Sequence, residues 1–314
     1  MRKALDFYEQ IELLKSRGLH FTSEEKAIEI LSNINYYNII NAYKELFLDK
    51  NVEEEKFKEK VTFEEICSVY IFDCKLRTLF LHFFLIAENK IRTKLSHNIS
   101  IRYNCEAYLD ETIYDANVVK IDQIKEFVHN ITEKNINKNI VQHFENINEN
   151  IPIWAFLDCF QFGDLRTFYF NLNQSIKDIV AKEFSLTSKQ FKSILSLINF
   201  FRNVAAHGNR FYNFRINDGY KQISDLNLHQ RLDIQRFNKK YKYGKKDLFA
   251  VLIALKYLLS SNEYEILINH ISEFIEEMHS NIFSISIKDI LIDMGFIPRD
   301  SNDNEIDWKI ILNL

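Results

Sequence analysis

Glycine and proline are scarce in this chain, since its 314 residues include six glycines and two prolines. Together these residues usually make up about 12% of a protein, and they supply most of the tight turns that sheets require. We therefore expect an all-α fold, in which helices are joined by polar loops. A hydrophobic content of 46% with 27 phenylalanines provides enough apolar material for a packed core and excludes intrinsic disorder.

The apolar segments are too short for a membrane span, and the cysteines show no metal-binding pattern. The longest purely apolar run is Leu248–Leu255, whereas a transmembrane helix needs roughly 20 apolar residues. The first 18 residues lack the apolar region of a secretory signal. The four cysteines form no C-x-x-C pair, so we expect free, buried thiols. These features predict a cytoplasmic protein with no metal, no cofactor and no membrane partner.

Capping boxes, in which Ser or Thr is followed three residues later by Glu or Gln, mark the expected helix starts. Thr22 with Glu25 predicts one start, and Thr62 with Glu65 predicts another. After Thr62, core-type positions recur every three or four residues, which is the period of an α-helix. This stripe consists of Ile66, Val69, Asp73, Leu76, Phe80, Phe83, Ala87, Ile91 and Leu95.

Two acid–arginine pairs at i,i+4 spacing lie on this predicted helix. Asp73, the one charge on the apolar stripe, precedes Arg77, and Glu88 precedes Arg92. As exposed ion pairs they would each stabilise the helix by about 0.2–0.5 kcal/mol. The alternative is that they position a functional site, and the sequence leaves both readings open.

Thr187 with Gln190 predicts the start of a further amphipathic helix. At 100° per residue, seven of its apolar side chains fall on one face. They are Phe191, Ile194, Leu197, Ile198, Phe201, Val204 and Ala205. Leu195 and Phe200 do not fit this face, and we expect them to contact a neighbouring helix or a second subunit.

The polar face of the same helix presents a cation, an amide and an imidazole, from Arg202, Asn203 and His207. Gly208 is a natural helix terminus. A guanidinium matches phosphate oxygens and keeps its charge, and an imidazole transfers protons near neutral pH. The trio suits metal-independent RNA cleavage, in which a 2′-hydroxyl attacks the adjacent phosphorus. By spacing alone, a solvated helix face or a buried, carbonyl-bonded histidine is the default interpretation.

The segment from Arg202 to His207 resembles the R-x4-6-H motif of HEPN domains. Its extension through Arg210, Phe211 and Asn213 resembles the Abi-like (AbiD/AbiF-type) abortive infection branch of that superfamily. Four further blocks resemble that branch in the same order. They are LKSRGLHF with Tyr36, Tyr37 and Tyr43, then Tyr70-x-Phe72-Asp73-x-x-Leu76-Arg77 with Glu88-x-x-Ile91-Arg92-Thr93, then residues 151–154 with 162–163, and residues 294–298 with Trp308.

This resemblance implies a HEPN-like helical bundle with additional N- and C-terminal helices. We accordingly divide the chain into an N-terminal helical segment (1–60), a helical core that carries the motif (61–280) and a C-terminal appendage (281–314). The resemblance also implies a ribonuclease of bacterial phage defence, active as a homodimer in which two motifs face one cleft. A structured noncoding RNA is a further partner that it suggests.

By position, the resemblance assigns phosphate contact to Arg202, general acid–base chemistry to His207 and orientation of one of these groups to Asn203. Two positions depart from related patterns. Gly208 stands where a second polar residue is common, which leaves open a non-catalytic RNA-binding or sensing module. Asn209 replaces the tyrosine that is adenylylated in related toxins, so we expect no control by adenylylation.

The segment 210–246 is basic and aromatic, although the whole chain has a net charge of −4. It contains ten Lys and Arg residues against three Asp, a net charge of +7. Cations beside aromatic rings suit phosphates and unstacked bases, so we expect an RNA-binding surface here. A solvated basic loop with its aromatic residues in the core is the alternative. The candidate contacts are Arg210, Arg215, Arg236, Lys239, Lys240, Tyr241, Lys242 and Tyr243.

Overall fold

The computed structural model describes residues 4–133, 138–147, 149–217 and 222–313. It is 64% helical, and the one sheet in these ranges consists of two short strands, β1 (Arg236–Phe237) and β2 (Lys240–Tyr241). The all-α fold expected from the scarcity of glycine and proline is therefore confirmed. No helix within the described ranges is long and apolar enough to cross a membrane.

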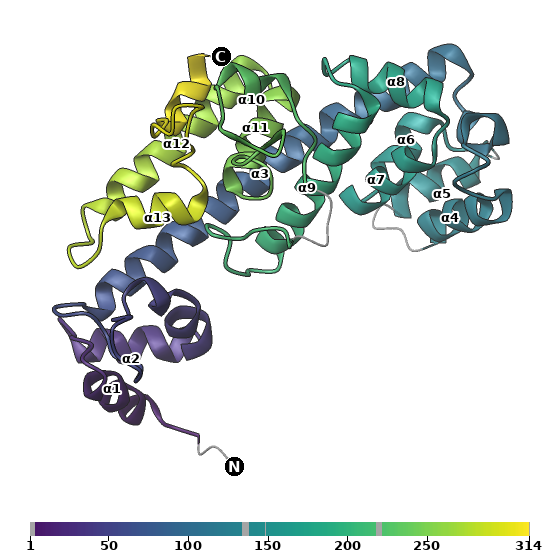
Figure 1. Ribbon diagram of the computed structural model, residues 1–314. Helices are drawn as coiled ribbons and strands as arrows, with labels where there is room; N and C mark the ends of the chain where they lie inside the picture. The colour runs from purple at the N-terminus through teal and green to yellow at the C-terminus, as the bar shows by residue number, and fades with distance from the viewer. Residues whose placement is uncertain (1–3, 134–137, 148, 218–221, 314) are drawn as a thin grey trace.

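Helix α3 (Phe63–Arg102) is the spine of the molecule (Figure 1). Its 40 residues extend about 60 Å at 1.5 Å per residue. Thr62 and Glu65 form the predicted capping box at its start. Every residue of the predicted stripe, including Asp73, is buried, because other helices pack against α3 along its length.

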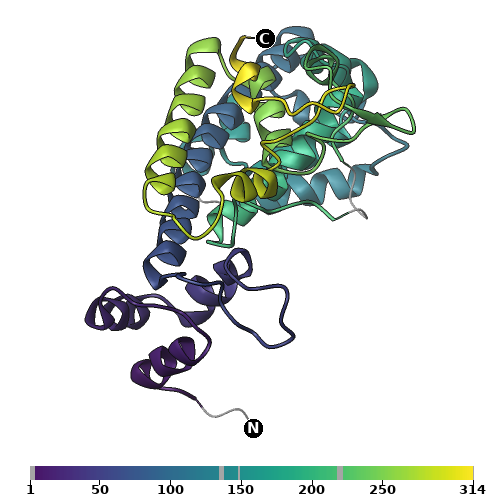
Figure 2. The same ribbon diagram turned by 60° about the vertical axis from the view of Figure 1, so that its left-hand side comes forward.

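The N-terminal segment packs at the beginning of α3 (Figures 1 and 2). It contains α1 (Phe7–Ser16), α2 (Glu24–Asn33), the π-helical turn η1 (Tyr37–Asn41) and the 3₁₀ turn η2 (Lys44–Leu46). The predicted cap of α2 is wrong by one residue, because Ser23 rather than Thr22 accepts the amide of Lys26. Glu64 of α3 accepts the amides of Thr22 and Ser23 at 3.0 and 3.4 Å, which fixes the chain before the helix.

A second group of helices surrounds the C-terminal end of α3, at the upper right of Figure 1. It comprises the 3₁₀ turns η3 (Ala107–Leu109) and η4 (Glu111–Ile113), and α4 (Ile121–Glu133), α5 (Lys138–Asn146), α6 (Ile153–Asp158), α7 (Phe162–Asn171) and α8 (Gln174–Lys182). Its core is aromatic, since Phe160 contacts Phe156 and Phe168 edge to face.

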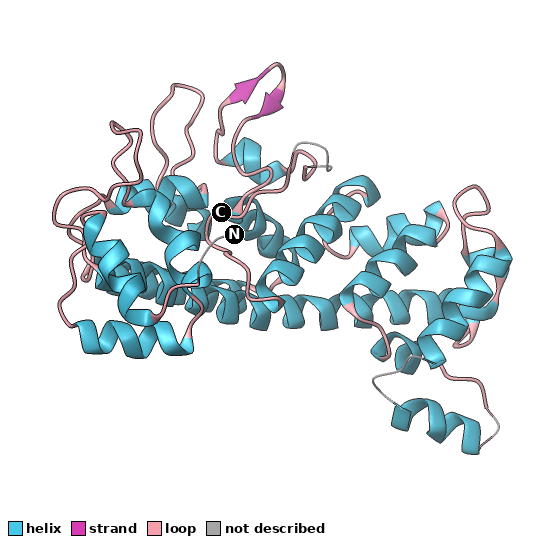
Figure 3. Cartoon of the chain, turned by 90° about the horizontal axis from the view of Figure 1, so that it is seen from below, coloured by secondary structure: helices cyan, strands magenta, loops and turns pink. Residues whose placement is uncertain are grey.

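The middle of α3 is covered by the C-terminal part of the chain. This part comprises α9 (Ser188–Ala206), α10 (Asn227–Arg231), α11 (Leu248–Leu258), α12 (Ser261–His279), α13 (Ile287–Met294) and the 3₁₀ turn η5 (Trp308–Asn313). Helices α9, α11 and α12 pack on α3, and the apolar run Leu248–Leu255 is buried within α11. The β1–β2 hairpin projects away from the helices (Figure 3).

Candidate functional site

Helix α9 carries the motif and is packed on several sides. Thr187 and Gln190 form the predicted capping box at its start. Helices α3, α7, α8 and α11 all contact α9, and its predicted apolar face is buried apart from the half-buried Val204. The same neighbours bury Leu195 completely and Phe200 in part. Leu195 therefore meets neighbouring helices, and its alternative place at a second subunit is wrong.

His207 is the C-terminal cap residue of α9 and is exposed. The backbone leaves the helix at Gly208, whose φ of +70° is a left-handed conformation that glycine adopts without strain. The amides of Gly208 and Asn209 bond the carbonyls of Ala205 and Val204 at 3.3 and 3.2 Å. No atom lies within 4 Å of where a Cβ of residue 208 would be, so backbone conformation, not space, favours glycine here.

The three motif side chains do not bond one another within the described residues. Asn203 and His207 are exposed, whereas Arg202 is half-buried. His207 lies five positions after Arg202, which is about 7.5 Å along the helix axis and about 140° around it. A single copy of α9 therefore presents the cation and the imidazole in different directions.

The positive charge of Arg202 acts on Glu88 of the spine helix. The Glu88 side chain is 4% exposed and accepts a hydrogen bond from Arg92 through Oε1. Burial raises the pKa of Glu88, while the charges of Arg92 and Arg202 oppose that rise. Its Oε2 is buried without a hydrogen-bond partner among the described residues. One carboxylate of α3 is thus subject to two guanidinium groups, one of which belongs to the motif.

The Glu88–Arg92 pair also joins distant segments of the chain. Arg92 donates both to Glu88 and to the backbone carbonyl of Phe160, between α6 and α7. The Arg92 side chain is 17% exposed. The reading of this pair as an exposed ion pair that only stiffens its helix is therefore wrong.

The second acid on α3, Asp73, holds the loop that follows the motif. Its carboxylate is fully buried and accepts the backbone amides of Phe211 at 3.1 Å and Tyr212 at 2.6 Å. The Tyr43 hydroxyl of the N-terminal segment donates to the same carboxylate at 2.7 Å, and the Tyr43 ring stacks on Tyr212. Burial raises the pKa of Asp73, and these hydrogen bonds oppose the rise. Three segments of the chain therefore meet at one carboxylate.

Arg77 completes this arrangement one turn along α3. Its guanidinium donates to Asp73 at 3.2 Å and to the backbone carbonyls of Gly208 at 2.9 Å and Asn209 at 3.0 Å. These carbonyls belong to the first two residues after His207. The pair therefore satisfies backbone donors and acceptors that the helix end leaves unpaired, and it fixes where α9 ends.

The predicted contacts of the basic segment 210–246 form two groups, and residues 218–221 of this segment lie outside the described ranges. Arg210 donates to the carbonyl of Ala42, and Arg215 donates to the carbonyl of Ile292 at 3.1 Å. Both arginines are exposed while they hold backbone of other segments. The other six candidates lie on the β1–β2 hairpin or just after it.

The hairpin cations are exposed, but its tyrosines are not. Tyr241 is buried, stacks on His229 with ring centroids 5.0 Å apart, and lies under the Arg236 guanidinium at 4.4 Å. Tyr243 is half-buried, with the Lys242 ammonium 5.3 Å from its ring centroid. The Tyr241 ring is therefore occupied within the protein.

Sequence reasoning missed two features of this region. The first is the bond from Tyr43 to Asp73, for which the only signal was the place of Tyr43 in a family-like block. The second is Phe237, which is 70% exposed on the hairpin. A buried and an exposed phenylalanine look alike in a basic, aromatic segment, so no local signal separates them.

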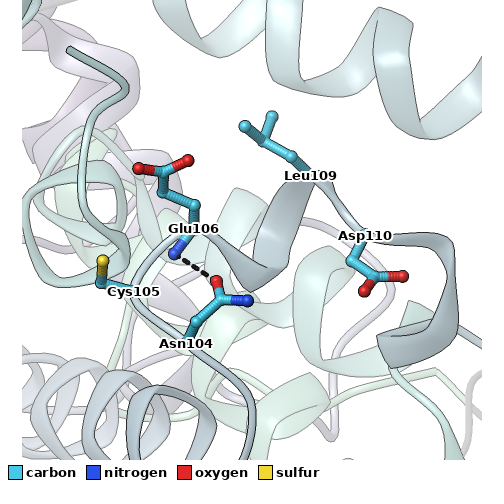
Figure 4. Close-up of a pocket in the computed structure, with 5 residues that line it drawn as sticks. All are labelled: Asn104, Cys105, Glu106, Leu109 and Asp110. Atoms are coloured by element: carbon cyan, nitrogen blue, oxygen red, sulfur yellow. Dashed lines mark hydrogen bonds between the residues drawn. The ribbon is translucent and has the colours of Figure 1, made fainter.

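Two cavities lie away from the motif. One of about 490 Å³ follows the end of α3 (Figure 4) and is lined by Asn104, Cys105, Glu106, Leu109 and Asp110. The other, of about 550 Å³, lies between α3 and α12 and includes Cys74, His82 and Phe274. Neither is lined by a motif residue. Among the described residues, no three His, Cys, Asp or Glu side chains gather as a metal site would require.

The chain matches a known protein family. A family model described as "Abi-like protein" matches residues 29–213, from α2 to the loop that Asp73 holds. The matched range includes both acid–arginine pairs and the Arg202–His207 motif, and it ends before the hairpin. No curated protein and no solved structure matches the chain.

Proposed function

The chain belongs to the Abi-like protein family, whose role is abortive infection in phage defence, and from this premise we propose that it is a metal-independent HEPN endoribonuclease. The observation that carries the proposal is the position of Arg202 and His207 at the end of α9. The loop that follows them is fixed to α3 by Asp73 and Arg77. A cation and a proton-transfer group on a rigid support suit phosphodiester cleavage.

In the proposed reaction, His207 accepts the proton of a 2′-hydroxyl whose oxygen attacks the adjacent phosphorus. The bond from phosphorus to the 5′-oxygen then breaks, and that oxygen takes up a proton. The products carry a 2′,3′-cyclic phosphate and a 5′-hydroxyl. Arg202 stabilises the negative charge of the crowded phosphorane, and Asn203 orients one of these two groups.

We further propose that the active form is a homodimer. Arg202 and His207 of one copy diverge by about 140° around α9, so one copy presents them poorly to a single phosphate. Two copies whose motifs face one cleft supply an arginine and a histidine from opposite sides. Cross-linking or light scattering at increasing protein concentration tests this arrangement, and a strictly monomeric active protein contradicts it.

The test is cleavage of total RNA by purified protein in the presence of EDTA, with sequencing that distinguishes the product ends. We expect 2′,3′-cyclic phosphate and 5′-hydroxyl ends, and loss of cleavage in Arg202→Ala and His207→Ala. Lys189→Ala and His279→Ala are matched controls, because Lys189 is an exposed cation of α9 and His279 an exposed histidine at the end of α12. EDTA-sensitive cleavage that leaves 3′-hydroxyl ends contradicts the mechanism.

A second candidate function is a non-catalytic RNA-binding or sensing module that associates with a structured noncoding RNA. Two observations favour it. Arg202 is half-buried and acts on Glu88, and Gly208 follows the histidine where a second polar group is common. Under this function, Arg202→Ala and His207→Ala keep RNA binding, and the wild-type protein cleaves no RNA at any concentration. Sequencing of RNA that copurifies with the wild type and with His207→Ala separates the two candidates.

A further inference from the structure

Phe237 exposes 70% of its surface on the β1–β2 hairpin. The turn residues are Asn238 and Lys239, both with positive φ (48° and 64°), which is typical of a type I′ hairpin turn. Lys240 is paired with Phe237 across the two strands. The turn does not require an aromatic residue at position 237, and the hairpin stands away from the helices (Figure 3). The ring is thus free to meet a partner.

The base of the hairpin is fixed to the fold. Tyr241 stacks on His229, which is fully buried. The His229 ring bonds the carbonyl of Gly244 through Nε2 at 2.8 Å and accepts the amide of Leu226 through Nδ1 at 3.2 Å. A tip presented on a rigid base loses little conformational entropy when it binds.

The hairpin carries positive charge that no ion pair among the described residues neutralises. Its exposed cations form no ion pair with a described carboxylate: Arg236, Lys239, Lys240 and Lys242. Two acids in this region are already engaged, since Asp225 pairs with Lys245 at 2.6 Å and Asp303 pairs with Arg299 at 3.3 Å. A polyanion is therefore the partner that this surface favours.

We propose that the β1–β2 hairpin is a docking element for single-stranded RNA, in which an unpaired base stacks on Phe237 and its phosphates contact the surrounding cations. Stacking on an aromatic ring beside cations is a general mode of single-strand binding, and it tolerates any base. The proposal rests on RNA being the substrate or partner in the proposed function. The hairpin lies outside the residues that match the family, 29–213.

The hairpin and the motif share a support in α9. The segment that leads to the hairpin lies against the first half of α9, where the Ser224 amide bonds Ser193 Oγ at 2.9 Å and Gln190 bonds the carbonyl of Asp225 at 2.8 Å. Ser193 precedes Arg202 by nine residues, which is about 13.5 Å of helix. The segment before the hairpin and the motif are therefore attached to the same helix.

The test measures binding of fluorescently labelled poly(U) and poly(A) strands by anisotropy, in a His207→Ala background so that no strand is cleaved. Phe237→Ala is expected to weaken binding about five- to a hundred-fold, as for loss of one stacked base, and Phe237→Trp to retain it. Phe283→Ala is the matched control, because Phe283 is 86% exposed but lies between α12 and α13. The double variant Lys239→Ala/Lys240→Ala should reduce the slope of log affinity against log salt by about 1.4.

Three results overturn the proposal. The first is equal RNA affinity with and without the Phe237→Ala change, and the second is no binding of either strand. The third is binding to phosphatidylserine vesicles that depends on Phe237 while RNA binding does not, which assigns the tip to a membrane surface. Cleavage assays separate this inference from the nuclease proposal. Phe237-dependent binding without cleavage leaves the docking element standing and removes the nuclease. Cleavage with the expected ends, together with unchanged RNA binding in Phe237→Ala, supports the nuclease and rejects the docking element.

Discussion

The carboxylate of Asp73 accepts the backbone amide of Tyr212 at 2.6 Å, across 139 positions of sequence. This bond joins the spine helix to the loop that follows His207. Arg77 and Tyr43 bond the same carboxylate, so the loop, α3 and the N-terminal segment depend on one buried charge. The position of His207 is therefore set from inside the molecule and not by α9 alone.

Replacing Asp73 should destabilise the protein strongly. Asp73→Ala leaves Arg77 and two buried amides without their partner, and we expect it to lower the free energy of unfolding by about 3–5 kcal/mol. Asp73→Asn keeps one acceptor and should cost about 1–3 kcal/mol. Urea unfolding measures both. The control is Asp303→Asn, which removes an exposed carboxylate that also pairs with an arginine four residues away and should change stability little. An equal loss of unfolding free energy in Asp73→Asn and Asp303→Asn contradicts this account.

Removing two different tyrosine hydroxyls of the N-terminal segment should have different effects on stability. Tyr43→Phe removes the bond to Asp73, and a hydrogen bond to a charged group contributes about 1.5–3 kcal/mol. The Tyr36 hydroxyl is buried without a hydrogen-bond partner among the described residues, so Tyr36→Phe should be neutral or slightly stabilising. Thermal unfolding of the two variants distinguishes a specific bond at Tyr43 from a general effect of losing a hydroxyl.

Gly208 should tolerate alanine poorly although there is space for it. Its φ of +70° costs a residue with a Cβ about 1–2 kcal/mol, so Gly208→Ala should lower stability by that amount, and Gly208→Asn by less. Gly163 is the matched control, since it lies in the first turn of α7 and its Cβ would make an ordinary contact of 3.7 Å with Asn199. Chemical unfolding that ranks Gly163→Ala as the more damaging change contradicts the conformational explanation.

Acidification should destabilise the base of the hairpin through His229. Burial lowers the pKa of His229 to about 4, and the charge of Lys245 adds to this effect. An unfolded histidine titrates near 6.5. Between pH 6.5 and 4 the unfolded chain therefore binds a proton that the folded chain does not, and the free energy of unfolding falls as the pH drops, by up to about 1.4 kcal/mol per unit.

Unfolding measured at pH 7 and pH 5 for wild type and His229→Gln checks this dependence. The variant should show a smaller loss between the two pH values, because its side chain does not titrate. His279→Gln removes an exposed histidine and should keep the wild-type dependence. Parallel curves for wild type and His229→Gln exclude His229 as the source.

Helical period and capping boxes predicted the buried stripe of α3 and the start of α9. The stripe of α3 is buried as expected, and α9 begins at its predicted capping box. The position of Leu195 could not be obtained in this way, because a helical wheel assumes one packed face, whereas four helices contact α9.

Long-range contacts carry the rest of the site, and local patterns do not contain them. The i,i+4 spacing identified Asp73 and Arg77 as a pair, but it could not show the Tyr43 hydroxyl or the backbone groups more than 130 positions away that also bond them. Composition likewise identified the basic segment without showing that Tyr241 is buried on His229 while Phe237 is exposed. Which aromatic ring meets solvent is decided by tertiary packing.

Glu88 is a positioning residue for Arg202 in the proposed nuclease. The charge of Arg202 acts on this buried carboxylate. Glu88→Gln keeps the shape of the side chain and removes the negative charge that we propose orients the Arg202 guanidinium. We expect kcat for RNA cleavage to fall about ten- to a hundred-fold, which corresponds to about 1.4–2.7 kcal/mol of transition-state stabilisation. KM should change little, because the cations that bind RNA elsewhere are untouched.

A matched control separates this effect from a loss of stability. Glu183→Gln removes an exposed carboxylate that pairs at 3.0 Å with Lys94, a residue of α3. This variant should cleave RNA as the wild type does. Glu88→Gln should show its lower kcat at temperatures where unfolding measurements find it fully folded. If Glu88 positions Arg202, its loss should move the guanidinium away from the phosphorane and lower kcat. An unchanged kcat in the folded Glu88→Gln variant therefore shows that Arg202 does not depend on Glu88.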